Sequence, residues 1–425
     1  MKQRSITKDL QHLKIKSPNF IYNVLGTVWK ILFKKKYNIH VEDKVNLKNI
    51  KGPYILISNH ASRLDYMYIG LPLLPARLNF VAGYNEFFRS HLQGVFKILQ
   101  VIPKKNFTSD VNTIKQISRV LKNNGKVMIF PEGMSSISGA NQPIVVGTGK
   151  FIKHFNVPVY YAVIKGGYLT SPKYNLDERP GRVDVTFDSL FTVDDIQKLS
   201  AEEIEDRINE AIYHDDYEWN KVNQYSYKVN ENFLKDIGDL LFICPKCKSE
   251  FTITSTNNTI KCLHCGNEID VDDKYMLLPH DETSVVPSTQ TEWFNMQREI
   301  IKKQILDENY KLEEIVDLGM LDDEKYLKNQ ATSNIVGVGR LTFDHTGLTY
   351  NGIKNNKPFS FHINTSDLPT FGMCTDLSRF YTFYQGTFYE FYPKTRCVEK
   401  WFLVAEEMHR LNGGKWQDFK FTKKE

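Results

Sequence analysis

The chain has 425 residues, of which 41% are apolar and 25% charged, and its formal net charge is +5. This composition is typical of folded globular proteins and excludes a disordered or fibrous chain. The length exceeds that of one compact domain, so two or three domains are expected. No stretch approaches the roughly 20 consecutive apolar residues that span a bilayer. The charged first 16 residues do not resemble a secretion signal, so we expect a cytoplasmic protein.

Positive charge is concentrated at the start of the chain. Residues 1–60 contain twelve Lys or Arg and three Asp or Glu, which favours anionic partners such as a phospholipid surface. A predicted helix over 19–36, preceded by Ser17 and Pro18, has one narrow polar stripe and a wide apolar face. We expect residues 1–45 to form a basic amphipathic region that binds membranes peripherally. Packing of this helix against the next domain is the alternative.

Residues 46–220 alternate between strand and helix patterns. Apolar runs predict buried strands at 54–58, 79–82, 126–130 and 157–164. Helical spacing over 111–121 is closed by Gly125, and Ser200 and Glu203 have capping-box spacing at the start of a helix that runs to Ile212. Strands separated by helices predict an α/β fold with a mostly parallel sheet covered by helices.

A histidine and an aspartate follow the first of these strands. His60 and Asp65 are separated by four residues. A histidine can take the proton of an attacking hydroxyl at neutral pH, and a carboxylate on its other ring nitrogen fixes the tautomer and stabilises the imidazolium. This pair predicts acyl transfer from a thioester to an alcohol without a serine or cysteine nucleophile. A buried structural pair is the alternative.

A second motif, Phe130-Pro131-Glu132-Gly133, follows the strand at 126–130. The proline ends the strand and the glycine permits a tight turn, which leaves Glu132 at the carboxyl edge of the sheet. Open α/β sheets bind ligands at that edge. We therefore expect both motifs to face one crevice.

These motifs resemble those of the glycerophospholipid acyltransferase superfamily, which includes lysophosphatidic acid acyltransferases. Asn59-His60-x-Ser62-x-x-Asp65 matches its first motif, and Phe130-Pro131-Glu132-Gly133 matches its third. Val157-Pro158-Val159 is similar to the fourth motif, and Val101-Ile102-Pro103-Lys104-Lys105 lies where the second normally ends in a phosphate-binding arginine. The resemblance covers residues 45 to 215. It implies that His60 is the base, Asp65 orients it, and Glu132 helps to hold the acceptor.

The resemblance also implies a substrate site, with one departure from the family pattern. Ser135 stands where the family commonly has a phosphate-binding arginine, so a terminal phosphate on the acceptor is open to question. The predicted substrate-binding residues are Ser62, Arg63, Lys104, Lys105, Glu132 and Gly133. Arg89 is a further candidate to replace the missing cation. The expected donor is acyl-CoA or acyl-carrier protein, and the expected acceptor is a lysophospholipid-like hydroxyl.

Four cysteines form two pairs with the spacing of a zinc ribbon. Cys244 and Cys247, followed after fourteen residues by Cys262 and Cys265, can complete a closed tetrahedral site. We expect residues 240–272 to bind a structural Zn²⁺. Zinc ribbons often bind nucleic acid or protein, but the basic excess lies at the N-terminus, so nucleic acid is not an expected partner.

The last part of the chain has a different pattern. Residues 300–425 are rich in aromatic and β-branched residues, with predicted hairpins around 344–347 and 385–386 and a closing helix over 398–411 that carries Trp401. This pattern resembles a pleckstrin-homology-like or GRAM-type domain, which implies lipid or protein binding. The sequence thus predicts a membrane-associated acyltransferase with two added modules. The alternative function is a non-catalytic membrane adaptor that uses an acyltransferase-like scaffold.

Overall fold

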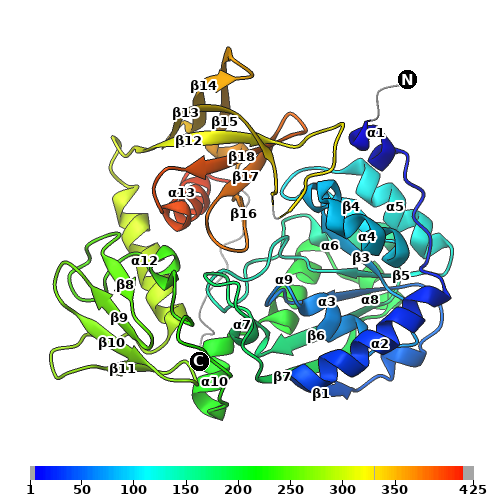
Figure 1. The fold of residues 1–425 in the computed structure, drawn as a ribbon. Coiled ribbons are helices and arrows are strands. Elements are labelled where there is room, and N and C mark those ends of the chain that lie inside the picture. Colours follow the sequence, from blue (N-terminus) through cyan, green and yellow to red (C-terminus); the bar gives the residue numbers. More distant parts are fainter. Residues whose placement is uncertain (1–4, 330, 415–425) are drawn as a thin grey trace.

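A computed structural model describes residues 5–329 and 331–414, and this part of the chain contains three β-sheets (Figure 1). The ends of the predicted N-terminal and C-terminal regions, residues 1–4 and 415–425, lie outside the described residues. The first sheet has the order β1-β7-β6-β2-β5-β3-β4. Its strands are β1 (Asn38–Asp43), β2 (Tyr54–Ser58), β3 (Asn79–Gly83), β4 (Ile102–Lys104), β5 (Lys126–Ile129), β6 (Val159–Lys165) and β7 (Arg182–Phe191).

The predicted mostly parallel α/β sheet is confirmed, with one antiparallel pair. Strands β1 and β7, β6 and β2, β2 and β5, β5 and β3, and β3 and β4 pair in parallel. Strand β7 returns antiparallel beside β6. Because β2 lies between β5 and β6, the loops after β2 and β5 leave the same edge of the sheet side by side.

The two faces of β2 pack against different helices. Ile55 and Ile57 share a core with residues of α5, α6, α8 and α9, whereas Tyr54 and Leu56 share the opposite core with α3. Successive side chains of a strand point to opposite faces, so a strand covered on both sides is apolar throughout. The helices of this region are α1 (Ile6–Gln11), α2 (Phe20–Lys36), α3 (Asp65–Gly70), α4 (Gln93–Leu99), α5 (Val111–Lys122), α6 (Thr148–Phe155), α7 (Gly167–Thr170), α8 (Val193–Lys198), α9 (Ala201–Ile212) and α10 (Asp216–Asn223).

Local capping explains where several helices begin and end. The predicted capping box of Ser200 and Glu203 is present at the start of α9. Helix α2 starts one residue after the predicted start at Asn19, because Asn19 is its N-cap and accepts from the Ile21 amide. The turn after α5 places Asn124 rather than Gly125 in the left-handed region, with φ 57°.

The second sheet lies in the region of the two cysteine pairs, and Cys262 is the last residue of its strand β9. Its antiparallel order is β11-β10-β9-β8, and short helix α11 and long helix α12 flank it in the chain. The bounds are α11 (Ile237–Leu240), β8 (Ile253–Ser255), β9 (Thr259–Cys262), β10 (Glu268–Val271), β11 (Leu277–Pro279) and α12 (Gln290–Gln304).

The third sheet is antiparallel and has the order β15-β14-β13-β12-β18-β17-β16. Both predicted hairpins are present, since Asp344 pairs with Gly347 and Tyr384 pairs with Thr387. The closing helix α13 (Val398–Leu411) buries Trp401 against Phe380, with ring centroids 5.7 Å apart. The strands are β12 (Leu312–Met320), β13 (Asn334–Asp344), β14 (Gly347–Lys354), β15 (Lys357–Asn364), β16 (Gly372–Met373), β17 (Phe380–Tyr384) and β18 (Thr387–Pro393).

The third sheet and α13, called here the C-terminal domain, lie over the carboxyl edge of the first sheet. Lys105, just after β4, donates to the Gly386 carbonyl oxygen at 2.7 Å, and Asn106 donates to the Tyr381 hydroxyl at 3.3 Å. Figure 1 shows the C-terminal domain above the first sheet in this view. One apolar core runs from the α3 face of the first sheet through the second sheet to α13. The C-terminal domain is therefore part of the surroundings of the predicted site.

Candidate active site

His60 lies two residues beyond the carboxyl end of β2 and is fixed there by its neighbour. The side-chain amide of Asn59 donates to the Ile164 carbonyl oxygen at 2.8 Å and accepts from the Ile164 amide at 2.8 Å. This pair of bonds ties the end of β2 to the end of β6. Asn59 thereby sets the direction in which the chain leaves the sheet.

The predicted histidine–aspartate pair is formed in the structure. His60 Nδ1 lies 2.8 Å from Asp65 Oδ2, and Asp65 is the first residue of α3. The Asp65 carboxylate also accepts from the Ser62 amide at 3.0 Å and from the Ser62 hydroxyl at 3.0 Å. Burial raises the pKa of Asp65, while the hydrogen bonds from His60 and Ser62 act in the opposite direction. With Nδ1 bonded to Asp65, Nε2 is the ring nitrogen left to take a proton.

Glu132 holds the backbone of His60. Its Oε1 accepts from the His60 amide at 2.6 Å and from the Asn141 side-chain amide at 3.2 Å, and its Oε2 accepts from the Gln142 amide at 2.8 Å. The Ser136 amide donates to the His60 carbonyl oxygen at 2.6 Å, so the loop after β5 binds His60 on both sides of its Cα. Glu132 is completely buried, and burial raises its pKa to about 8.

The ring of His60 is also supported from the side. It stacks on Phe130, with centroids 4.2 Å apart and an interplanar angle of 21°. The bond to Asp65 and this stacking restrict both torsions of the side chain. The His60 side chain is still 23% exposed, because its remaining edge faces a large cavity.

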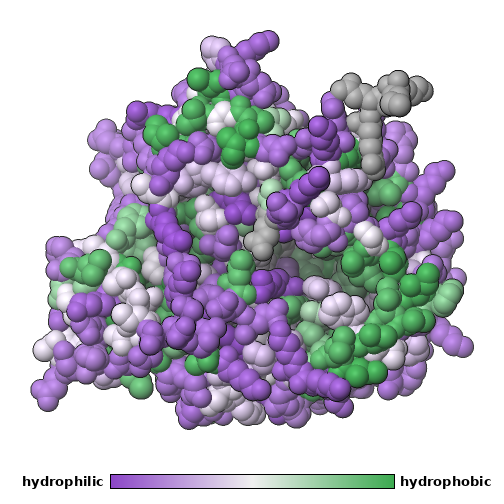
Figure 2. Space-filling model, in the orientation of Figure 1, coloured by the Kyte–Doolittle hydropathy of each residue, from purple (hydrophilic) through white to green (hydrophobic). Residues whose placement is uncertain are grey.

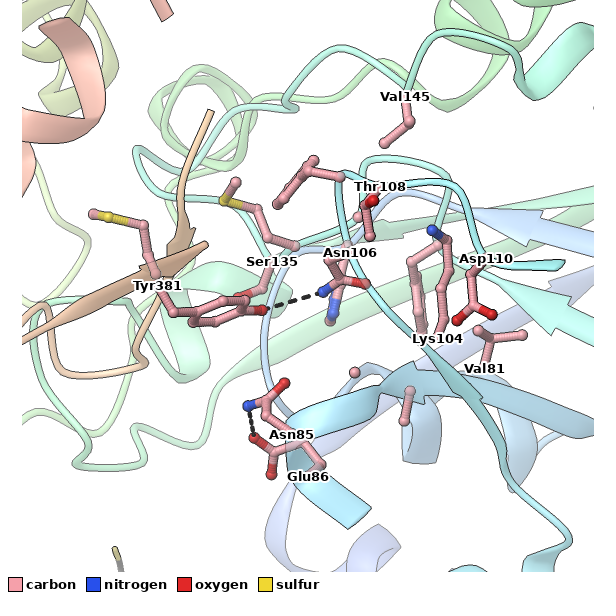
Figure 3. Close-up of a pocket in the computed structure, with 18 of the residues that line it drawn as sticks. Val81, Asn85, Glu86, Lys104, Asn106, Thr108, Asp110, Ser135, Val145 and Tyr381 are labelled. Carbon is pink, nitrogen blue, oxygen red and sulfur yellow. Dashed lines mark hydrogen bonds between the residues drawn. The ribbon is translucent and has the colours of Figure 1, made fainter. Parts of the chain in front are cut away.

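The cavity has a volume of about 1980 Å³ and lies between the first sheet and the C-terminal domain. It is larger than the roughly 300–1,000 Å³ of ordinary small-molecule pockets, which suits a long ligand. Figure 3 shows 18 of its lining residues and the hydrogen bond between Asn106 and Tyr381, which joins the loop after β4 to β17. The C-terminal domain contributes Met373, Cys374, Asp376, Arg379, Tyr381 and Glu390 to the lining.

The structure brings most of the predicted substrate residues to this cavity. Ser62, Arg63, Lys104 and Gly133 line it, and so does Arg89. Gly133 has φ +80°, and a Cβ atom there would lie 3.1 Å from the Phe107 ring, so a side chain would be strained and crowded.

The predicted basic residues differ in how far they are already paired. Arg63 pairs with Glu178 at 3.6 Å, and Arg89 pairs with Glu86 at 2.9 Å. Lys104 Nζ donates to a backbone oxygen at 3.3 Å, and burial lowers its pKa.

Two of the predicted residues do not line the cavity. The Glu132 carboxylate points into the protein, as described above, and the Lys105 ammonium is directed to the Gly386 carbonyl oxygen and lies 5.1 Å from the Tyr84 ring centroid.

The structure adds cavity residues that sequence reasoning did not select. Lys173, from the segment between α7 and β7, lines the cavity and donates to Ser135 Oγ at 2.9 Å. Arg379, from the loop between β16 and β17, also lines it. Neither residue lies in a motif, and each reaches the site only through packing of distant segments. In the sequence, only the serine at position 135, where the family commonly has an arginine, pointed to the part of the cavity that Lys173 occupies.

The four cysteines come together as the spacing predicts. Their sulfur atoms all lie within 4.8 Å of one another. Cys244 Sγ is 3.7 Å from Cys265 Sγ, and Cys247 Sγ is 3.8 Å from Cys262 Sγ. Four sulfurs at the Zn–S distance of about 2.3 Å form a tetrahedron with edges of about 3.8 Å. The cluster therefore has the size and chemistry to bind a metal ion.

Helix α2, labelled in Figure 1, presents an apolar surface to solvent, which is green in Figure 2. Phe20 is 71% exposed and Trp29 is 56% exposed. The other exposed apolar residues of this face are Ile21, Val24, Leu25, Val28, Ile31 and Leu32. Within the described part of the chain, no helix combines the length and the apolar character needed to cross a membrane.

Comparisons with known proteins agree with the geometry around His60. The acyltransferase family model matches residues 38–165. The chain is similar to a 1-acyl-sn-glycerol-3-phosphate acyltransferase of Cocos nucifera, with 31% identity over 145 residues, covering 33% of this chain and 46% of that protein. Residues 38–165 are thus an acyltransferase-family domain. The chain spans about half the length of this curated relative.

A solved structure also resembles part of the chain. It is the 1-acyl-sn-glycerophosphate (LPA) acyltransferase PlsC from Thermotoga maritima, with 21% identity and a TM-score of 0.37. The match covers 45% of this chain and 77% of that chain.

Proposed function

We propose that the protein transfers a fatty acyl group from an acyl thioester to the hydroxyl of a lysophospholipid-like acceptor, as a 1-acylglycerol-3-phosphate acyltransferase does. The observation that carries this proposal is the His60–Asp65 pair with the free edge of its imidazole at the large cavity. The acyltransferase-family match over residues 38–165 supports the same chemistry.

In the proposed reaction, His60 Nε2 takes the proton of the acceptor hydroxyl as its oxygen attacks the thioester carbonyl carbon. A carbon–oxygen bond forms and the carbon–sulfur bond breaks. The departing thiolate then takes the proton from His60, so the enzyme returns to its starting state. Asp65 keeps the Nδ1–H tautomer and stabilises the transient imidazolium. Acyl-CoA and acyl-carrier protein are the proposed donors.

We assign Glu132 a positioning role instead of the acceptor contact that the family resemblance implies. Its carboxyl group accepts from the His60 amide and is sealed from the cavity. It therefore acts by holding the His60 backbone against the loop after β5. Ser62 plays a similar part, since its amide and hydroxyl both donate to Asp65.

An assay with labelled long-chain acyl-CoA, acyl-carrier protein in parallel, and lysolipids with and without a terminal phosphate tests the proposal. Transfer that the His60→Ala variant lacks is the expected result. Folded, metal-loaded protein that transfers to no acceptor would favour the non-catalytic membrane adaptor.

We further propose that α2 binds an anionic membrane surface peripherally. Its exposed apolar face ends at Lys34 and Lys35, which are exposed and suit contact with headgroups. Helix α4, which contacts α2, contributes Val95 and Phe96 to the cavity lining. Binding of α2 to a lipid surface would therefore hold the cavity close to its lipid substrates.

We propose that the cysteine cluster binds one structural Zn²⁺. Four thiolates leave no open coordination position, so the ion would stabilise the second sheet and take no part in acyl transfer. As functional units we propose residues 1–45, 46–220, 240–272 and 300–425. In this division, the acyltransferase domain carries the catalytic pair and the C-terminal domain completes the cavity.

A further inference from the structure

Lys173 is a buried cation beside the loop that holds His60. Its residue exposure is 6%, it lines the cavity, and its Nζ donates to Ser135 Oγ at 2.9 Å. The next residue, Ser136, donates its amide to the His60 carbonyl oxygen. The ammonium group therefore lies against the same short loop that fixes the catalytic histidine.

The groups that face Lys173 do not neutralise it fully. These groups are Cys374, Asp376 and Glu399, all from the C-terminal domain. Burial raises the pKa of Cys374 to about 12, so this thiol is uncharged at neutral pH. Burial also raises the pKa of Glu399 well above its ordinary value, which disfavours its charged form. Asp376 is ionised, but its carboxylate accepts from Ser378 and pairs with Arg379 at 3.6 Å.

A buried ammonium without its own ion pair is costly, and folded proteins pair such charges. None of the ion pairs formed among the described residues includes Lys173, and its ammonium donates to a neutral hydroxyl, that of Ser135. Burial lowers the pKa of Lys173 to about 8, so the group is still mainly protonated at pH 7. The missing counter-ion is best supplied by a ligand in the cavity.

We propose that Lys173, together with the Ser135 hydroxyl, binds the phosphate of the acceptor's headgroup, in a subsite that residues 374–379 of the C-terminal domain enclose. This inference rests on the proposed acyl transfer for the identity of the ligand. A lysine binds phosphate as a point charge, and a hydroxyl adds a hydrogen bond. Arg63 is less suited, because Glu178 already pairs with it.

Two acceptors that share an acyl chain and differ only in phosphate test this subsite: lysophosphatidic acid and monoacylglycerol. Lys173→Met should raise KM for lysophosphatidic acid about 10- to 100-fold, as expected for a lost charged hydrogen bond. KM for monoacylglycerol and for acyl-CoA should change less than about threefold. Lys173→Arg should restore part of the preference for lysophosphatidic acid over monoacylglycerol that Lys173→Met loses. An equal rise for both acceptors, or a rise for acyl-CoA, would overturn the proposal.

Two other lysines complete the kinetic test. Lys153 donates to the Ile196 and Leu199 carbonyl oxygens, away from the cavity, so Lys153→Met should leave both KM values unchanged. Lys104 lines the cavity and is the rival phosphate ligand. A rise in KM for lysophosphatidic acid alone in Lys104→Met, with no such rise in Lys173→Met, would contradict the assignment of the phosphate subsite to Lys173.

Binding to the His60→Ala protein separates this inference from the proposed activity. Calorimetry should show lysophosphatidic acid binding that Lys173→Met weakens at least about tenfold. Binding should also weaken as pH rises through about 8, where Lys173 loses its proton, and this pH dependence should vanish in the variant. If the wild type transfers nothing but binding still depends on Lys173, the activity fails and the subsite stands. Binding that is indifferent to Lys173→Met would refute the subsite.

Thermal unfolding distinguishes a ligand-binding lysine from a structural one. Without ligand, Lys173→Met should unfold at the same or a higher temperature, since it removes an under-compensated buried charge. A clear drop in Tm with equal loss of activity toward both acceptors would assign Lys173 a structural role and contradict the proposal.

Discussion

Two histidine–aspartate pairs in this protein have nearly the same contact and different surroundings. His60 Nδ1 lies 2.8 Å from Asp65, and His214 Nε2 lies 2.7 Å from Asp216. Both carboxylates are buried and accept backbone amides: Asp65 from Ser62, and Asp216 from two residues around the start of α7. His60 lines the cavity, whereas His214 does not and is only 10% exposed in its side chain.

The difference teaches that the pair alone does not define a catalytic site. The His60 pair lies at the carboxyl edge of a sheet, where the loops after β2 and β5 meet. The His214 pair fixes the backbone where β6 meets α7. Substitutions in the first pair should therefore change turnover, and substitutions in the second should change stability.

The largest expected effect follows from removing each aspartate. In the proposed mechanism the Asp65 carboxylate stabilises the imidazolium, and Asp65→Asn replaces it by an amide, so kcat should fall by about two to four orders of magnitude. Asp216→Asn should lower the free energy of unfolding, with kcat per folded molecule unchanged within about threefold. Steady-state kinetics and urea denaturation of both variants measure this. Similar kcat losses in the two variants would remove the distinction between the pairs.

Loss of the cysteine cluster should lower the stability of the protein strongly and should have no direct effect on acyl transfer. Purified protein should contain close to one zinc per chain, and a Cys244→Ser/Cys262→Ser variant should lose the metal and unfold at a lower temperature. Metal analysis and thermal unfolding measure both quantities. Cys397→Ser, away from the cluster, is the control and should keep its zinc. Full zinc content in the double variant would refute the site.

A smaller effect concerns Glu132, which supports His60 from inside the protein. The pKa of Glu132 is about 8 in the folded protein, whereas its ordinary value is 4.5. Between these two pH values the folded protein therefore keeps a proton that the unfolded chain has released. The free energy of unfolding should therefore decrease as pH rises from about 4.5 to about 8 and level off above it. Glu132→Gln should remove this contribution. Denaturation series at pH 5 and pH 8 compare the two proteins, and identical pH dependence would contradict the assignment.

Glu132→Gln also tests whether Glu132 positions His60 or only packs the protein interior. The amide nitrogen of Gln would face a backbone N–H donor, either of His60 or of Gln142, so kcat should fall about 10- to 100-fold. Glu205 is a matched control, because it is buried and accepts the Gly147 and Gly149 amides far from His60 in the chain. Glu205→Gln should cost stability and spare kcat. Equal losses of kcat would argue against positioning by Glu132.

The smallest expected effect lies on the surface. Lys34→Gln and Lys35→Gln should each weaken sedimentation with anionic vesicles by about 1 kcal/mol, and high salt should weaken wild-type binding. Trp29→Glu should weaken it further by disturbing the apolar face. Val222→Glu is the control, since Val222 is an exposed apolar residue on α10. Vesicle binding that these α2 variants leave unchanged would refute the membrane proposal.

The sequence predicted those features that depend on neighbouring residues. Strand β2, the helices α5 and α9 and both hairpins follow from local periodicity and capping, and the His60–Asp65 contact follows from a spacing of five residues. The cysteine cluster was predictable because metal ligation imposes a spacing. These features need little information about the rest of the fold.

Features that depend on distant packing could not be predicted in this way. The two segments that place Lys173 and Arg379 at one cavity are about two hundred residues apart, and neither carries a motif. Lys105 was a plausible phosphate ligand in the sequence, but the C-terminal domain binds it through Gly386. The burial of Glu132 likewise depends on Asn141 and Gln142 folding over it.

The central claim is most directly tested by the ratio of acyl-transfer rates in His60→Ala and His214→Ala, measured per folded molecule with labelled acyl-CoA and lysophosphatidic acid. The proposed mechanism predicts that His60→Ala loses about two to four orders of magnitude of rate while His214→Ala keeps nearly all of it. Comparable rates in the two variants would contradict the assignment of His60 as the catalytic base.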